Sequence, residues 1–461
     1  MSKIIRRTIY VIATLMLFAA CDTSNDDVDI ITKNEFSSKD IKALNSLLYG
    51  NSISESEVVS KAESFMNMFD QPNSSTRSAS RRVSEVIPAV GSNILTRSLD
   101  EEGEDTLAYI INFADDMGYV FASADRRTDF IMAISPEGNI NPNVEDMNNS
   151  GIEVFFANLE GAYNRQIQET EAIKSELLKD STLNLEQNIK NTKAAYGDEL
   201  QFDFLTFVVN KIVGPFVTVG WRQTSPYNDN APLINGERAT AGCVSVAVAQ
   251  MLSYYYYPET TDWTEMIKYP IVVSSTGKAQ VAELFRWIGD GINTHWDTFS
   301  NGGSGALVSD VDNFFSSIFF GNPGVYAAYD STRVFACLDK NIPVIMSGFS
   351  LKETYRYKTW FLGKTKTRIT YKGGHAWLVD GYMDASCSET IKIGDWTYYY
   401  FDTKSFLHCN WGDGIAPNGY YAADAFDYYY PITRSSTTID GTEGYYQFKL
   451  EALYDADPRG Y

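Results

Sequence analysis

Cys243 is the residue of this sequence best placed to act as a nucleophile. It follows Gly242 and opens the run CVSVAVAQMLSYYYYP, in which apolar residues recur at three and four residue steps, as in a helix. Thr240 or Gly242 is positioned to cap that helix, so the thiol is predicted in the first turn, where free amides and the helix dipole favour a thiolate. The alternative is a structural thiol, because free cysteines are among the most buried residues. The stripe expected to be buried comprises Val244, Val248, Met251 and Tyr255.

A cysteine nucleophile needs a base, and histidine is the usual partner because its pKa lies near neutral pH. The chain has three histidines. His375 follows Gly373 and Gly374 at the start of an apolar strand pattern, an arrangement that leaves the ring accessible. His408 falls inside another strand pattern and is interpreted as structural, whereas His295 lies in a polar loop with no glycines before it. His375 is therefore the predicted base.

The remaining cysteines indicate neither a metal site nor a fixed disulfide framework. Cys337, Cys387 and Cys409 accompany Cys243, and the four allow three pairings in an oxidising compartment. The sequence has no CxxC spacing, and three histidines are too few to suggest zinc. It also has no glycine-rich phosphate loop, so no cofactor or metal is expected.

Residues 1–20 are typical of an export signal, with a basic segment before a short apolar stretch that ends in small residues. A membrane span needs roughly 20 apolar residues, which makes a transmembrane helix the weaker interpretation. The sequence LFAAC, residues 17–21, resembles a bacterial lipobox. This resemblance implies that Cys21 is lipidated and anchors an exported protein to a membrane. The alternative is ordinary secretion after cleavage near Ala20.

Length and charge limit the classes to which the protein can belong. A chain of 461 residues predicts two or three domains. Its composition is globular, with 44% hydrophobic and 21% charged residues. The net charge of −21 repels phosphate backbones and no basic stripe is present, so nucleic acid is not an expected partner.

Composition divides the rest of the chain into three segments. Residues 21–104 are polar, with a serine- and arginine-rich stretch at 74–82, and predict a tether followed by a flexible region. Residues 105–200 predict a small domain and a connector, and residues 202–461 predict a larger domain. The small domain is expected to contain a hairpin at 108–125, a strand at 129–135 and a helix from residue 152 with Phe155, Phe156, Leu159, Tyr163 and Ile167 on one face.

The larger domain combines a helical first half with a strand-rich second half. The helix opened by Cys243 comes early, and strand patterns follow at 375–382, 396–402 and 405–412, separated by turn-rich segments. Helices followed by antiparallel strands predict an α+β fold.

Four blocks of this domain resemble the streptopain family of secreted bacterial cysteine peptidases, and they occur in that family's order. The blocks are WRQTSPYN at 221–228, ATAGCVSVAVAQM at 239–251, GGHAWLVDGY at 373–382 and HCNWGDG at 408–414. His375 lies 132 residues after Cys243 (375 − 243), within the roughly 130 to 150 typical of papain-like pairs. The resemblance implies a papain-like catalytic domain, and the domain at 105–200 is similar to the family's inhibitory propeptide.

The resemblance also implies a role for each matching residue. Cys243 would attack the scissile carbonyl, with His375 as its acid and base. Gln223 would form the oxyanion hole together with the Cys243 amide. The alternative is that Gln223 is an ordinary solvated residue of a loop. Asn410 and Trp411 would orient and shield the imidazole. The alternative for Trp411 is an ordinary residue of the hydrophobic core. The protein is then an exported zymogen that hydrolyses protein or peptide substrates, is inhibited by its own propeptide and is activated by a cut between about 180 and 215.

Two features depart from the family pattern. The family usually has a second tryptophan two residues after the first, where this chain has Asp413, so the resemblance does not extend to the shielding of the site or to its leaving-group side. An aromatic and basic insertion at 351–372 predicts an extra hairpin beside the site. Two other functions stay open from the sequence: a catalytically silent surface-binding lipoprotein, and another thiol acyl-transfer enzyme of the amidase or transglutaminase kind.

Overall fold

The computed structural model describes residues 37–70, 81–90, 106–140, 151–180, 184–196, 203–319, 321–358, 365–393, 396–426 and 449–459. The predicted signal at 1–20 and the lipidation site Cys21 lie outside these residues. Within the described ranges, no helix has both the length and the apolar character needed to cross a membrane.

The first half of the chain folds as a small α+β domain. The hairpin predicted at 108–125 is confirmed as β2 and β3, and β4 follows as the third strand. The elements are α2 Ser38–Tyr49, α3 Glu55–Asp70, β1 Val83–Val90, β2 Thr106–Phe113, η2 Ala114–Asp116, β3 Tyr119–Ser123, β4 Ile131–Ser135, α4 Ile152–Lys179 and α5 Leu185–Tyr196. The predicted helical face of α4 is buried at Phe155, Phe156, Leu159 and Tyr163.

Part of the segment expected to be a flexible tether, residues 21–104, is instead folded. Ser37 and Asp40 form a capping box that begins α2, and Ile41, Leu44 and Leu48 of that helix are buried. Helix α3 buries Phe65 against the sheet, and β1 pairs with β2. The prediction was wrong here because the polar faces of two amphipathic helices dominate the composition and hide their apolar stripes.

The second half is the larger domain and confirms the α+β prediction, since its helices precede most of its strands. Its elements are β5 Asp203–Val213, β6 Leu233–Ile234, β7 Glu237–Arg238, α6 Cys243–Tyr255, α7 Ser275–Gly291, η5 Phe299–Asn301, α8 Val308–Ile318, β8 Val325–Ala328, α9 Ser331–Asp339, β9 Val344–Lys358, β10 Thr365–Ile393, β11 Trp396–Asn410, β12 Gly419–Ala422, η6 Ala423–Phe426 and β13 Glu451–Tyr454. The two strand patterns at 396–402 and 405–412 form one strand, β11, rather than two.

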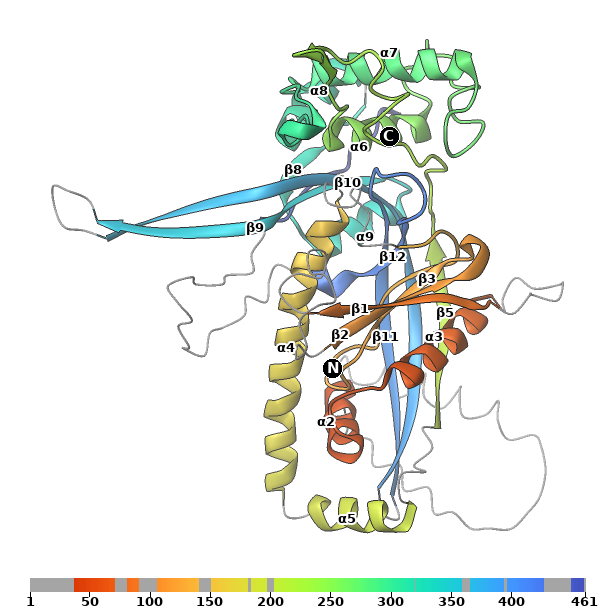
Figure 1. Ribbon diagram of the computed structural model, residues 1–461, viewed down its shortest axis with the longest axis vertical. Helices are drawn as coiled ribbons and strands as arrows, with labels where there is room; N and C mark the ends of the chain where they lie inside the picture. The colour runs from red at the N-terminus through yellow and green to blue at the C-terminus, as the bar shows by residue number, and fades with distance from the viewer. Residues whose placement is uncertain are drawn as a thin grey trace, which may run out of the picture. The chain divides into compact units, whose positions relative to one another are not determined.

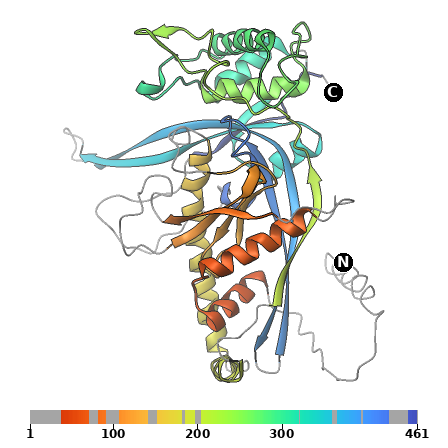
Figure 2. The same ribbon diagram turned by 45° about the vertical axis from the view of Figure 1, so that its right-hand side comes forward.

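The predicted insertion at 351–372 is confirmed as a hairpin made by the ends of β9 and β10. Lys358 pairs with Thr365 and the register continues to Leu351 with Lys372. Both views show this hairpin standing away from the other strands (Figure 1, Figure 2). The same register then carries β10 directly into Gly374 and His375.

One sheet runs through both halves of the chain (Figure 1). Its strand order is β1-β2-β3-β4-β12-β11-β10-β9-β13-β8, and β5 pairs with β10 beside this path. The two halves join where Tyr420 and Tyr421 of β12 pair with Ile134 and Ala133 of β4. The Tyr119 hydroxyl adds a buried hydrogen bond to the carbonyl of Pro417 at 2.8 Å.

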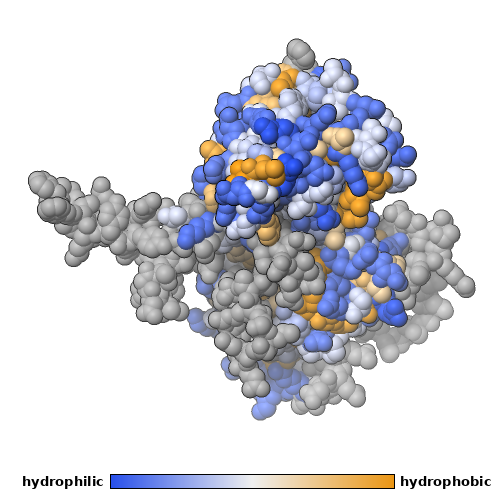
Figure 3. Space-filling model, turned by 45° about the horizontal axis from the view of Figure 1, so that its top comes forward, coloured by the Kyte–Doolittle hydropathy of each residue, from blue (hydrophilic) through white to orange (hydrophobic). Residues whose placement is uncertain are grey.

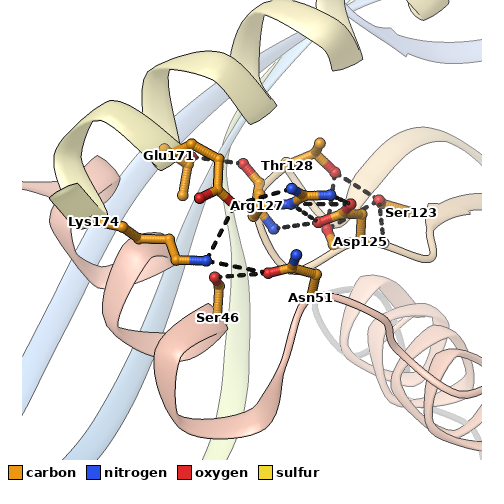
Figure 4. A network of polar contacts seen from close by, with 9 residues as sticks. Ser46, Asn51, Ser123, Asp125, Arg127, Thr128, Glu171 and Lys174 are labelled. Atoms are coloured by element: carbon orange, nitrogen blue, oxygen red, sulfur yellow. Dashed lines mark hydrogen bonds and ion pairs between the residues drawn. The ribbon is translucent and has the colours of Figure 1, made fainter. Parts of the chain in front are cut away.

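Polar contacts tie the helices of the small domain together (Figure 4). Arg127 pairs with Asp125 and, at 3.0 Å, with Glu171 of α4, while Lys174 pairs with Glu171 at 3.1 Å. Helix α4 is therefore held on the loop after β3. A second cluster joins the two halves, because Lys404 of β11 donates to the buried Asp129 at 2.7 Å.

The outer surface is mainly hydrophilic on the face that Figure 3 brings forward, where small apolar patches are separated by polar groups. This agrees with the net charge of −21, which favours solubility.

Candidate active site

Helix α6 places Cys243 at its first position, as predicted. Gly242 is the N-cap residue and has a φ of 83°, a conformation that favours glycine. A Cβ at Gly242 would also lie 3.1 Å from the carbonyl oxygen of Ser304. All residues from Val244 to Ser253 are buried, so the helix is fixed on nearly all sides, although Tyr255 of the predicted stripe is only half-buried.

Two loops hold the backbone that leads into Cys243. The amide of Ala241 donates to the carbonyl of Gln223 at 2.9 Å, which brings the predicted oxyanion residue beside the nucleophile segment. The amide of Thr240 donates to the carbonyl of Asp297 at 3.0 Å, and its hydroxyl accepts from the amide of Ser304 at 2.8 Å. The loop that carries Asp297 and Ser304 was not identified from sequence; its glycine-rich stretch NGGSG was the available signal.

His375 lies on β10, opposite Gly348 of β9, and is only 6% exposed. Gly373 has a φ of 62°, and Gly374 lies against the ring of Phe349. The prediction that these glycines leave the imidazole accessible is wrong for the uncut chain. The first turn of α4 covers the ring, a long-range contact that the local pattern could not reveal.

Cys243 at the start of α6 and His375 of β10 lie close enough for each to shift the pKa of the other. Burial alone would raise the pKa of Cys243, but the neighbouring His375 imidazole, together with nearby backbone amides, lowers it. Burial alone would lower the pKa of His375, but its interactions with Cys243 and with Glu153 raise it to about 9. The pair therefore favours thiolate and imidazolium, the charge state that a cysteine nucleophile needs.

The N-terminus of α4 reaches the same imidazole. The Glu153 carboxylate lies 3.6 Å from His375 Nε2. Gly151, just before the helix, lies so close to Trp411 that an added Cβ would be 2.9 Å from that ring and 3.3 Å from Trp377 Cβ. The small domain therefore covers the site with a helix end, and sequence reasoning did not identify either Gly151 or Glu153.

Asn410 and Trp411 lie at the end of β11 and are both buried. Asn410 Oδ1 accepts from Gln250 Nε2 at 2.8 Å, and its Nδ2 donates to the carbonyl of Val219 at 2.8 Å. The Asn410 amide is thus engaged by groups other than His375, unlike the expected orienting residue. The Trp411 ring packs against Trp377, with ring centroids 5.3 Å apart and the ring planes tilted by 41°.

The other candidate residues lie in settings that differ from that of the Cys243 pair. His408 pairs with the buried Asp380 at 2.6 Å, as expected of a structural histidine, and His295 is exposed. The four described cysteines are free thiols, so none of the three possible pairings forms among them. Burial raises the pKa of Cys337 to about 11 and that of Cys409 well above its usual value.

The loop that departs from the family pattern packs against the oxyanion segment. Gly412 lies on Val246 of α6, and Gly414 lies against the Arg222 guanidinium, next to Gln223. Asp413 between these two glycines is half-buried. In the described ranges, no cluster of histidine, cysteine and acidic residues has the arrangement of a metal site.

A thiol at a helix N-terminus, next to a histidine, is an arrangement that suits thiol-dependent hydrolysis. Residues 221–262 and 259–421 match the model of the Peptidase C10 family. Over 355 residues the chain is 20% identical to streptopain of Streptococcus pyogenes serotype M1, spanning 69% of this chain and 74% of streptopain. The resemblance to the streptopain family is confirmed, and the protein is a cysteine-type peptidase.

Two solved structures from Prevotella intermedia are also similar to this chain. A prointerpain A fragment has a TM-score of 0.45 and 17% identity, and the match covers 77% of this chain and 96% of that one. Active interpain A, a cysteine protease, has a TM-score of 0.32 and 22% identity, and the match covers 47% and 87%.

Substitution of Gly151 tests how closely the helix end fits. In Gly151→Ala the added Cβ overlaps the Trp411 ring, so we expect α4 to lift and hydrogen exchange at residues 152–156 to accelerate by about tenfold. Exchange mass spectrometry of the full-length chain measures this. Gly305→Ala is the matched control, because a Cβ there meets no atom within 4 Å. Equal exchange in both variants would contradict the close fit.

Proposed function

We propose that the protein is an exported cysteine endopeptidase, made as a zymogen, that hydrolyses peptide bonds of protein or peptide substrates through Cys243 and His375. The observation that carries this proposal is the Cys243 thiol at the start of the buried helix α6, next to the His375 imidazole that lowers its pKa. The match of residues 221–421 to a peptidase family supports the same chemistry.

In the proposed mechanism, the Cys243 thiolate attacks the scissile carbonyl carbon and forms a tetrahedral oxyanion. The Gln223 side-chain amide and the Cys243 backbone N–H stabilise that charge. The His375 imidazolium then gives its proton to the leaving amine as the C–N bond breaks and leaves an acyl-enzyme. A water molecule gives a proton to His375 and attacks the thioester, which releases the acid and restores the thiol. Trp411 shields the imidazole from solvent.

Latency comes from the small domain in this proposal. Its helix α4 begins over His375, with Gly151 against Trp411, and its strand β4 pairs with β12 of the catalytic domain. A peptide substrate needs access to both Cys243 and His375. A cut in the connector, followed by departure of the small domain, would give that access.

Catalysis is tested on the full-length chain carrying an inserted recognition sequence for an added protease ahead of Asp203. After the cut, we expect Cys243→Ala and His375→Ala to lower casein hydrolysis by about 10³-fold or more, and Gln223→Ala by about 10²–10³-fold. Cys387→Ser and His295→Ala are matched controls and should keep parental activity. An inactive but folded parent, or an active Cys243→Ala variant, would contradict the proposal.

The proposed activating cut lies N-terminal to Asp203, which narrows the expected range of about 180–215. Strand β5 pairs with β10 from Tyr382 to Thr390, and Lys211 of β5 pairs with Asp339 at 2.9 Å. After β5, the amides of Phe216 and Val217 donate to Asp380 at 2.9 and 2.8 Å. Removing β5 would expose the edge of the strand that carries His375.

N-terminal sequencing of the matured enzyme checks this boundary. We expect the mature chain to begin at or before Asp203. The strand β5 is then part of the mature chain and stays with it when the enzyme is purified under denaturing conditions. A mature N-terminus between residues 204 and 217 in a fully active enzyme would show that β5 is dispensable.

We also propose that Cys21 carries a lipid that anchors the exported protein to a membrane, on the basis of the lipobox-like sequence at 17–21. In a bacterial host, Cys21→Ser should abolish metabolic labelling with palmitate and shift the protein from the membrane to the soluble fraction. Cys387→Ser is the cysteine control. Unchanged labelling of the Cys21 variant would favour ordinary secretion.

A further inference from the structure

The segment from Val217 to Gln223 leads to the predicted oxyanion residue without forming a helix or a strand. Three buried side chains, from β10, β11 and α6, hold its backbone at every second residue. These contacts are Val217 N to Asp380 Oδ2 at 2.8 Å, Asn410 Nδ2 to the carbonyl of Val219 at 2.8 Å and Gln250 Nε2 to the carbonyl of Trp221 at 3.4 Å. The segment is therefore fixed by side chains where a strand would be fixed by a neighbouring strand.

Gln250 and Asn410 also bond to each other. Gln250 Nε2 donates to Asn410 Oδ1 at 2.8 Å, and the amide of Gly412 donates to the same oxygen at 3.4 Å. Both hydrogens of Gln250 Nε2 are thus used, one toward Asn410 and one toward the carbonyl of Trp221. A flipped glutamine amide would place its oxygen against two other oxygens, so the chemistry of the partners fixes its orientation.

These contacts close a ring around the nucleophile. Gln250 lies seven residues (250 − 243) after Cys243 in α6, about two helical turns on, and so on the same side of the helix. Gln250 reaches Trp221, and Gln223 follows two residues later. The carbonyl of Gln223 then accepts from the amide of Ala241, two residues before Cys243, at 2.9 Å. The place of Gln223 relative to Cys243 is therefore set from both sides.

We propose that Gln250 and Asn410 are positioning residues of the oxyanion hole, which set Gln223 relative to the backbone amide of Cys243. This inference rests on the proposed function, in which those two donors stabilise the oxyanion. Asn410 then serves the oxyanion hole through Val219 and Gln250, and not the imidazole. A donor in such a hole is effective only at hydrogen-bond distance from the developing charge, so a small displacement of Gln223 slows the reaction.

Other contacts keep this segment folded when the amide network is disturbed. The amide of Gly220 donates to the carbonyl of Pro270 at 2.8 Å. The Trp221 ring is fully buried and lies near Phe285, with ring centroids 5.9 Å apart. Loss of one amide contact is therefore expected to displace the backbone near Gln223 without unfolding the domain.

The test removes each amide while keeping the shape of its side chain. Asn410→Leu and Gln250→Met are made in the full-length chain with the inserted recognition sequence ahead of Asp203, and hydrolysis of a peptide is measured after the cut. We expect each variant to lower kcat about 10- to 100-fold and to change KM by less than about threefold, because the oxyanion forms only during the reaction. Gln280→Met, at a half-buried position of α7, is the matched control and should keep parental activity.

Alkylation separates an effect on the oxyanion hole from an effect on the imidazole. Iodoacetamide reacts with a thiolate at a saturated carbon and forms no oxyanion, so the rate and pH dependence of Cys243 alkylation should be the same in cut Asn410→Leu as in the cut parent. A shifted pH dependence would mean that Asn410 acts on His375, contrary to the inference.

A double variant tests whether the positioning residue works through Gln223. In cut Gln223→Ala, we expect the added Asn410→Leu change to lower kcat by less than about threefold, because the donor that Asn410 positions is already absent. A further loss as large as that in the parent background would show that Asn410 acts by another route and would overturn the inference.

The outcomes distinguish this inference from the proposed function. An active cut parent whose Asn410→Leu and Gln250→Met variants keep parental kcat would refute the inference and leave the proposed function standing. An inactive cut parent would refute the proposed function. Hydrogen exchange of the uncut chain then decides whether the network holds Gln223: exchange at residues 219–223 should be about tenfold faster in Asn410→Leu than in Gln280→Met, and equal exchange would show that it does not. Should Asn410→Leu misfold, Gln250→Met carries the same tests.

Discussion

The pairing of strand β10 is the constraint on which the rest of the structure depends. Residues 365–379 pair with β9, residues 378–393 pair with β11, and residues 382–390 pair with β5. Such a strand has little freedom to shift its register, because a slip of one residue would turn every side chain to the opposite face of the sheet. His375 and Trp377 are two residues apart, so both project to the same face, where the start of α4 meets them.

The second fixed element is α6, and its burial explains why the nucleophile can be held so firmly. Ten consecutive residues after Cys243 are buried, which leaves the helix no apolar face to expose by rotation. The positive φ of Gly242 and the hydrogen bonds of Thr240 and Ala241 then set where the first turn begins. The thiol and the imidazole both lie on rigid elements. The part of this site that is free to move is therefore the segment that covers it, the start of α4.

How far the sequence predicted this site depends on the range of the interactions involved. Cys243 and His375 were identified because a helix start and a glycine-flanked strand are local patterns, and motif blocks support both. Glu153 was missed since a glutamate in a first turn is ordinary, and only the approach of α4 to β10 gives it a role. The support of Thr240 by Ser304 and the commitment of Asn410 to Gln250 were hidden for the same reason. The helices at 38–70 were missed because their apolar stripes are diluted by polar residues.

The energetics of the buried His375–Glu153 pair limit what it can do. Moving two charges out of water costs several kcal/mol per ion, and their attraction at best repays that cost, so the pair adds little to the affinity between the two halves. Apolar contacts of Gly151 and Phe155 and the β4–β12 hydrogen bonds must supply that affinity. Cys243 and then Glu153 raise the pKa of His375 to about 9, so loss of the small domain, and of Glu153 with it, would lower that pKa. An imidazole that titrates near neutral pH exchanges protons with substrate and water most readily, so the event that opens the site would also adjust its acid–base chemistry.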